Sequence, residues 1–333
     1  MTFDIGRRQF ISVLGGAASL AWPLAARAQQ PAMPVVAFIN SGSPITSARY
    51  AAAFRTGLSE TGYVEGQNVT AEYHYLEGKY DRLPALMADL TSRHVAVIAT
   101  PANIVASLAA KAATATIPIV FGVSEDPVRL GLVASFARPG SNATGINNFG
   151  HEVTAKRLRL LHDLVPKAVR IAVLVNPANA SSAETTLREA QEAAPTIGLQ
   201  IQMLNATTIG EIDAAFASLA RGHSDALFVA ADVFFTSRRG QFATLTARYR
   251  IPSAYATRDP VAAGGLMSYG TDLADSFHQV GVYTGNILKG AKPADLPVVQ
   301  STKFEFVINL QTARALGIEV PSELLSIADE VIE

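Results

Sequence analysis

Apolar runs alternate with amphipathic stretches along most of this chain. The first apolar run, Met33 to Asn40, ends in a polar residue, which is typical of a strand buried in a parallel sheet. In the next stretch Tyr50, Phe54 and Leu58 recur four residues apart, so they share one face of a helix. The same order then repeats, with strands expected at 69–75, 95–99 and 117–121 and helices near 81–90 and 102–113. The pattern predicts a parallel sheet covered by helices.

The alternation of strands and helices starts again near residue 150. After a helix over 154–164, strands are expected at 170–175, 199–204, 226–229 and 251–255, with helices near 183–194, 209–219 and 237–249. Two such runs predict an α/β chain with two doubly wound parallel-sheet lobes. Two strands at 266–269 and 305–309 and a helix over 272–288 are too few for a third domain, so we expect them to complete the two sheets.

The lobe boundaries are predicted from this order. Lobe one is expected to comprise residues 33–148 plus about 263–298, and lobe two residues 149–262 plus about 299–333. Residues 290–297 are rich in glycine and proline and are interpreted as a strap that crosses between the lobes. The expected hinge segments lie near 146–150, 255–264 and 290–297.

The first 28 residues have the pattern of an export signal. Arg7 and Arg8 precede an apolar stretch over 10–24, and Ala26-Arg27-Ala28 matches the small-x-small site of a signal peptidase. The paired arginines and the weakly apolar core indicate a twin-arginine signal. The apolar stretch is too short to span roughly 30 Å of hydrocarbon. We expect cleavage before Gln29 and a periplasmic location, with an uncleaved tether as the alternative.

Composition and motifs narrow the class of function. The chain has 27 basic and 28 acidic residues, which favours neither nucleic acid nor a membrane surface as a partner. It has no cysteine, so disulfides, thiolate metal sites and cysteine nucleophiles are excluded. Residues 122–126 begin like a nucleophile elbow but lack the second glycine, and Ala155 stands where a zincin motif opened by His151 and Glu152 needs its second histidine. We expect no enzymatic activity, no cofactor and no metal.

Ligand sites of open α/β sheets lie at the carboxyl ends of the strands. In lobe one these positions hold Asn40, Ser41, Thr100, Pro101, Ala102, Asn103, Ser124, Asp126 and Asn147. In lobe two and the returning strands they hold Asn176, Asn179, Asp232, Phe234, Tyr255, Ser268 and Tyr269. The hydroxyl and N–H groups of the first set suit a ligand carboxylate, and Asp232 beside aromatic rings suits an ammonium group. The alternative is that these residues are ordinary caps, turns and core, with Asp232 capping a helix.

An ordered set of motifs carries a family resemblance. It comprises the leader that closes in Ala-Arg-Ala-Gln-Gln-Pro, the segment 57–69 (GLSETGYVEGQNV), Tyr80-Asp81-Arg82-Leu83-Pro84, residues 117–121 (IPIVF) with Asp126-Pro127-Val128, and residues 264–270 (GGLMSYG). Over its whole length the chain resembles the ABC-transporter substrate-binding proteins of the tryptophan/tyrosine-binding type. The resemblance implies a type I periplasmic binding fold, with two lobes joined by three crossing strands and one small ligand enclosed by hinge closure.

The resemblance also implies partners and site residues. It implies a monomer that delivers an amino-acid-like or aromatic metabolite to an ABC permease in the inner membrane; the alternative is a periplasmic sensor subunit that regulates a membrane kinase. It assigns ligand contact to the loops at Asn40 and Ser41, 100–103, Ser124 and Asp126, Asn176 and Asn179, and Asp232 with Phe234. This chain departs from the family pattern at Ala230 to Phe235 and at Val123-Ser124-Glu125, where Glu125 places an extra carboxylate near the expected pocket.

Overall fold

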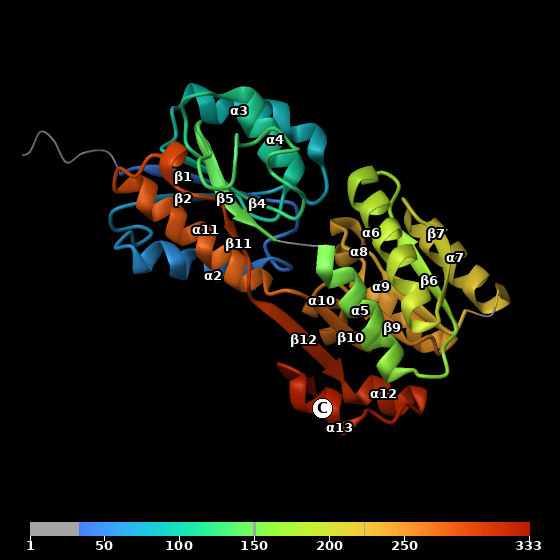
Figure 1. Ribbon diagram of the computed structural model, residues 1–333. Helices are drawn as coiled ribbons and strands as arrows, with labels where there is room; N and C mark the ends of the chain where they lie inside the picture. Colours follow the sequence, from blue (N-terminus) through green and yellow to red (C-terminus); the bar gives the residue numbers. More distant parts are fainter. Residues whose placement is uncertain (1–32, 149–150, 223) are drawn as a thin grey trace, which may run out of the picture.

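The computed structural model describes residues 33–148, 151–222 and 224–333. The export signal and its cleavage site lie outside these residues, as do Gly150 and His223. The described chain folds into two α/β lobes that lie beside each other (Figure 1), which confirms the predicted fold class. In the described ranges, no helix combines the length and the apolarity needed to cross a membrane.

Lobe one contains a six-stranded parallel sheet in the order β11-β5-β4-β3-β1-β2. Its strands are β1 (Val35–Asn40), β2 (Thr70–Tyr75), β3 (Val97–Thr100), β4 (Ile119–Val123), β5 (Ala143–Asn147) and β11 (Val299–Gln300). Its helices are α2 (Ala48–Glu60), α3 (Leu83–Ser92), α4 (Ile104–Ala113) and α11 (Leu273–Leu288), with short 3-10 turns η1 (Tyr80–Arg82) and η3 (Pro293–Asp295). The apolar residues of α2 and α11 pack on one face of the sheet, and those of α3 and α4 pack on the other.

Lobe two contains a seven-stranded sheet in the order β13-β12-β10-β9-β8-β6-β7, parallel except for the β10–β12 pair. Its strands are β6 (Arg170–Val175), β7 (Gln200–Asn205), β8 (Ala226–Val229), β9 (Ser253–Tyr255), β10 (Met267–Thr271), β12 (Phe304–Asn309) and β13 (Glu330–Ile332). Its helical segments are α5 (His151–Leu164), α6 (Ala180–Ala193), η2 (Ala194–Ile197), α7 (Ile209–Gly222), α8 (Val233–Ser237), α9 (Arg239–Tyr249), α10 (Arg258–Ala262), α12 (Leu310–Leu316) and α13 (Ser322–Ile327). Two apolar cores lie on opposite faces of this sheet.

Three connections run between the lobes: β5 to α5, β10 to α11, and β11 to β12. The first falls in the segment 146–150, of which residues 149 and 150 lie outside the described residues, and the other two lie away from the expected segments. Residues 290–297 do not cross, because Gly140 and Thr144 of lobe one donate hydrogen bonds to the carbonyls of Ala294 and Leu296. Residues 255–264 stay in lobe two, where the Val261 carbonyl accepts a hydrogen bond from Asn309 Nδ2.

The expected lobe boundaries shift for the same reason. Within the segment 263–298 that was assigned to lobe one, β10 pairs with β9 and β12 and is therefore part of the lobe-two sheet. Conversely, β11 pairs with β5 in the lobe-one sheet. The second and third crossings consequently lie at Asp272 and at residues 301–303.

Close backbone contact fixes the returning helix α11 to lobe one. A Cβ atom placed on Gly281 would lie 2.1 Å from the Phe54 carbonyl oxygen, and one on Gly57 would lie 2.0 Å from the His278 carbonyl oxygen. Glycine is therefore required on both helices for this approach. Because α2 and α11 pack this closely, the chain that returns from lobe two is held against the lobe-one sheet.

Two side-chain contacts join the lobes beside the crossings. The Tyr50 hydroxyl on α2 donates to Asp259 Oδ2 on α10 over 3.2 Å. The guanidinium of Arg49 lies 3.5 Å from the Glu305 carboxylate on β12. Burial raises the pKa of Glu305, and the charge of Arg49 opposes that rise. These contacts place the start of α2 against α10 and the start of β12 in lobe two.

Candidate functional site

The loop after β1 is organised by Asn40. Its Oδ1 accepts hydrogen bonds from the Gly42 N–H and from the Ser47 hydroxyl, both over 2.7 Å. Asn40 and Ser41 are both buried. The side-chain amide oxygen of Asn40 therefore holds the loop in its conformation through these two hydrogen bonds.

The turn after β3 combines satisfied and unsatisfied groups. The Thr100 hydroxyl is fully buried and lies 2.8 Å from the Ser107 hydroxyl, and Pro101 is buried beside it. Ala102 adopts a left-handed φ of 53°. Asn103 Oδ1 accepts the Ala106 N–H over 3.0 Å and so caps α4. The Asn103 Nδ2 is buried and has no hydrogen-bond partner among the described residues.

The turn after β4 carries two acids with different surroundings. Asp126 Oδ1 accepts the N–H groups of Val128 and Arg129 over 2.8 and 3.3 Å, so this carboxylate stabilises the turn, while Ser124 is exposed. Glu125 Oε2 is buried and accepts no hydrogen bond from the part of the chain that the structure describes. Burial raises the pKa of Glu125, and hydrogen bonds from backbone N–H groups oppose this rise.

The ends of β5 and β11 complete this edge of lobe one. Asn147 Nδ2 donates to the carbonyls of Val123 and Glu125 over 3.2 and 2.8 Å, which fixes the turn after β4. Neither polar atom of the buried Asn148 amide has a partner in the described ranges, and the same holds for the buried hydroxyl of Ser301.

Four side chains with such buried atoms, Asn103, Glu125, Asn148 and Ser301, form what we call the lobe-one polar cluster. They follow the neighbouring strands β3, β4, β5 and β11. Backbone hydrogen bonds link these strand ends, from Asn103 to Gly122, from Asn148 to Val123 and from Ser301 to Asn147. Each buried unpaired polar group costs roughly 1–3 kcal/mol, so a cluster of them indicates a surface prepared for a polar ligand.

The corresponding edge of lobe two is built around Asp232. This carboxylate accepts four hydrogen bonds, from the N–H groups of Phe234 (2.9 Å) and Phe235 (3.3 Å) and from the Nδ2 atoms of Asn176 and Asn179 (3.1 Å each). A carboxylate offers about four acceptor positions. Asp232 therefore caps α8 and fixes both asparagines at the end of β6.

The aromatic residues expected at this edge divide into core and surface. Phe234 is half-buried, and the Arg238 guanidinium lies 5.6 Å from its ring centroid. Tyr255 is core: its ring packs edge-on against Phe242, and burial raises its pKa to about 12. Ser268 is buried within β10. The ring of Tyr269 stacks on that of Phe304 with centroids 5.9 Å apart.

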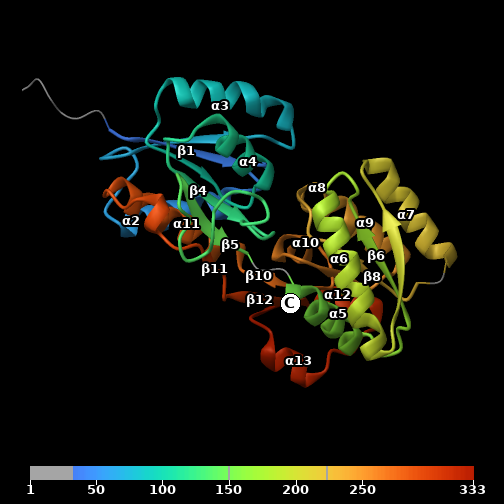
Figure 2. The same ribbon diagram turned by 45° about the horizontal axis from the view of Figure 1, so that its top comes forward.

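One aromatic residue of lobe one lies within electrostatic reach of the lobe-two edge. Tyr80 follows β2 and is half-buried. Burial raises the pKa of its hydroxyl, and a hydrogen bond with the Ser41 side chain opposes this rise. The negative charge of Asp232 in lobe two raises the pKa of Tyr80 further. Tyr80 and Asp232 are thus within electrostatic reach of each other. In both ribbon views α8 lies on the side of lobe two that is turned toward lobe one (Figures 1 and 2).

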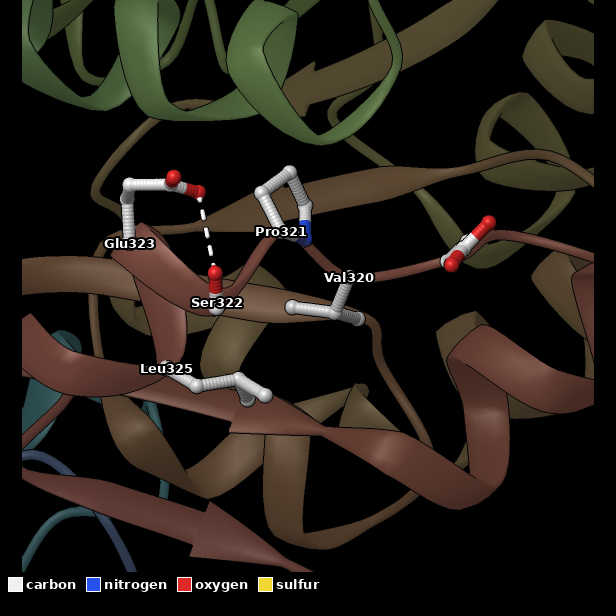
Figure 3. Close-up of a pocket in the computed structure, with 6 residues that line it drawn as sticks. Val320, Pro321, Ser322, Glu323 and Leu325 are labelled. Atoms are coloured by element: carbon white, nitrogen blue, oxygen red, sulfur yellow. Dashed lines mark hydrogen bonds between the residues drawn. The ribbon is translucent and has the colours of Figure 1, made fainter.

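Two surface depressions lie apart from the lobe-one polar cluster and from Asp232. A depression of about 500 Å³ is lined by a single segment, residues 319–323 and Leu325, and its one drawn hydrogen bond joins Ser322 Oγ to Glu323 Oε2 (Figure 3). A second depression, of about 580 Å³, lies between β2 and α3. Within the described chain, no three His, Asp or Glu side chains gather as they would around a metal ion.

The strand-end rule named most of these residues from the sequence but did not separate their roles. It missed Asn148 and Ser301, which follow β5 and β11, and it left Glu125 outside the ligand set. Glu125 follows a strand that was predicted, so the same rule could have included it, whereas no strand was predicted at β5 or β11, which Asn148 and Ser301 follow. Tyr80 was visible only as part of a family motif.

Comparisons with known proteins agree with this architecture. A tyrosine-binding protein of Clostridioides difficile (strain R20291) is 26% identical over 269 residues, which cover 80% of this chain and 76% of that protein. A conserved domain protein of Vibrio cholerae superposes with a TM-score of 0.79 at 25% identity, covering 90% of this chain and 99% of that one. An ABC domain of Streptococcus pneumoniae in complex with L-Trp superposes with a TM-score of 0.82 at 24% identity, covering 90% of this chain and all of that one.

These likenesses confirm the type I periplasmic binding fold that the resemblance implied. A family model described as ABC transporter substrate binding protein matches residues 35–332, almost the whole described chain. Proteins of this class bind a ligand and carry out no reaction, which agrees with the failed enzyme motifs. The chain belongs to the family of ABC transporter substrate-binding proteins.

Proposed function

We propose that this protein captures an amino-acid-like ligand between its two lobes and delivers it to an ABC permease in the inner membrane. The observation that carries the proposal is the lobe-one polar cluster, in which buried donors and acceptors at four neighbouring strand ends have no partner among the described residues. A ligand with several polar groups would form hydrogen bonds with these donors and acceptors. Membership of a family of substrate-binding proteins supports this role for the cluster.

The proposed ligand class is an aromatic amino acid. Relatives named for tyrosine binding or bound to L-Trp support this class. So do Tyr80 and the half-buried Phe234, which offer aromatic rings from the two facing edges. The sequence-predicted residues at these edges, from Asn40 and Asn103 to Asn176 and Asp232, line or support the proposed site.

The proposed compartment is the periplasm. The leader with Arg7 and Arg8 supports export by the twin-arginine route, and the mature chain is proposed to act as a monomer. Replacing both arginines with lysine should retain precursor in the cytoplasm. An unchanged periplasmic yield would contradict this route.

The test is to purify the mature protein, residues 29–333, and to measure bound mass by native mass spectrometry. A retained species whose mass matches an amino acid, together with titration calorimetry that detects binding of L-tyrosine or L-tryptophan, is expected. Ligand should also reduce the radius of gyration in small-angle scattering, because contact with both lobes favours the closed arrangement. A protein that binds neither amino acid and does not change shape would contradict the proposal.

A further inference from the structure

Each lobe has an acidic residue after a central strand, Glu125 after β4 in lobe one and Asp232 after β8 in lobe two. The two carboxylates differ in how many further hydrogen bonds they can accept. In lobe two, all four hydrogen bonds to Asp232 come from its own lobe. A ligand ammonium at Asp232 would compete with the donors that cap α8 and fix Asn176 and Asn179. Binding there would give up protein hydrogen bonds in exchange for ligand hydrogen bonds.

In lobe one, Glu125 has the opposite character. Its Oε2 is buried, and no described residue donates a hydrogen bond to it. Its backbone is fixed, because its carbonyl oxygen accepts Asn147 Nδ2 over 2.8 Å. A carboxylate with an unused buried oxygen gains a charge-assisted hydrogen bond when an ammonium arrives.

The neighbours of Glu125 supply the remaining contacts of an amino acid. Among the described residues, Asn103 Nδ2 has no acceptor and follows the adjacent strand, so it is suited to a ligand carboxylate. Asn148, on the other side, offers a donor and an acceptor that have no partner in the same ranges. Asn103 and Asn148 are each 3% exposed. These amides show that the polar surface around Glu125 extends over several strands.

We propose that Glu125 of lobe one, not Asp232 of lobe two, receives the cationic group of the ligand, so that this protein selects ligands that carry an ammonium group. This inference rests on the proposed function. It assigns Glu125 as the specificity-determining residue for the ammonium and leaves Asp232 as the group that positions the lobe-two edge.

The experiment compares three probes that share one ring. They are L-tyrosine, tyramine, which lacks the carboxylate, and 3-(4-hydroxyphenyl)propionate, which lacks the ammonium. The matching indole series, L-tryptophan, tryptamine and indole-3-propionate, is measured alongside. Calorimetry is run on wild type, Glu125→Gln, Asp232→Asn and the control Glu60→Gln, which makes the same change at an exposed end of α2.

Glu125→Gln should weaken the amino acid and the amine by about ten- to hundred-fold, while affinity for the deaminated acid changes by less than about three-fold. Glu60→Gln should change none of the affinities, and the melting temperature of ligand-free Glu125→Gln should not fall. An equal loss for all probes, no loss for the amines, or an amine-selective loss in Asp232→Asn instead would overturn the assignment. If wild type binds no probe of either series, the proposed function fails and this inference fails with it.

Discussion

The edges of the two lobes use similar residues in different ways. In lobe two, Asp232 gathers two helix N–H groups and two asparagine amides, so its acceptor capacity is used within the lobe. In lobe one, the polar cluster keeps buried amide, carboxylate and hydroxyl atoms that have no partner among the described residues. The Asp232 carboxylate therefore has its acceptors occupied without a ligand, whereas the lobe-one cluster does not, although the buried hydroxyls of Tyr255 and Ser268 in lobe two also have no partner in the described ranges. An acid after a strand can thus be part of the scaffold or a candidate ligand contact, and its hydrogen-bond partners distinguish the two.

The largest expected effect tests the scaffold role of Asp232. Asp232→Ala removes the α8 cap and leaves the Asn176 and Asn179 amides without their acceptor, so the free energy of unfolding should fall by about 2–4 kcal/mol. Urea denaturation measures this loss. The control Asp213→Ala removes one exposed hydrogen bond, to Gln241, and should cost under about 0.5 kcal/mol. A similar small cost at Asp232 would remove the contrast between the lobes.

A smaller effect compares one asparagine from each edge. Asn176→Ala loses a hydrogen bond to Asp232 and should destabilise the ligand-free protein by about 1 kcal/mol. Asn148→Ala removes a buried amide that has no partner in the described chain, so the free energy of unfolding of this variant should not fall below that of wild type. Affinity for L-tyrosine should show the larger loss in Asn148→Ala. Equal losses of stability would mean that the Asn148 amide is part of the scaffold.

The smallest effect concerns pH. Burial raises the pKa of Glu125 above its ordinary value of 4.5, so the folded protein holds this proton more tightly than the unfolded chain does. The resulting stabilisation is present below the unfolded-state pKa and is lost as the pH rises through the folded-state pKa. Glu125→Gln should therefore gain stability relative to ligand-free wild type as the pH rises from about 4 to about 7.

Glu330 provides the control with the opposite sign. The hydrogen-bonded Arg258 holds the pKa of Glu330 below its ordinary value, so Glu330 contributes stability above the unfolded-state pKa that is lost at lower pH. Glu330→Gln should thus lose stability relative to wild type over the same rise in pH. Parallel curves for the two variants in urea unfolding would contradict the different environments assigned to these acids.

The sequence predicted the layers of both lobes because buried parallel strands are continuous apolar runs. Residues 170–175 were expected as a strand and form β6, and residues 33–40 contain β1. The crossings were harder to place. The glycine and proline residues at 290–297 indicate an irregular segment, but they do not indicate which lobe that segment contacts. The contact is made by Gly140 and Thr144 of lobe one, which lie far from it in the sequence. The true crossing at 301–303 carries no glycine or proline.

The sequence offers the candidate site as a set of positions and does not distinguish their roles. Asp126 and Asp232 look equivalent to Glu125 in the sequence, since each follows a strand. Their roles depend on donors that the fold supplies, such as Asn176, which lies 56 residues from Asp232. Pairing between distant residues is decided by register and packing, which a single sequence does not reveal.

The most direct measurement is a crystal structure of the mature protein with L-tyrosine bound. We expect the ligand ammonium within hydrogen-bond distance of Glu125 Oε2 and the other polar atoms of the ligand on Asn103 and Asn148. The hydrogen bonds from Phe234, Asn176 and Asn179 to Asp232 should remain intact. An ammonium seated on Asp232, with Asn176 or Asn179 displaced and Glu125 Oε2 still without a partner, would contradict this expectation.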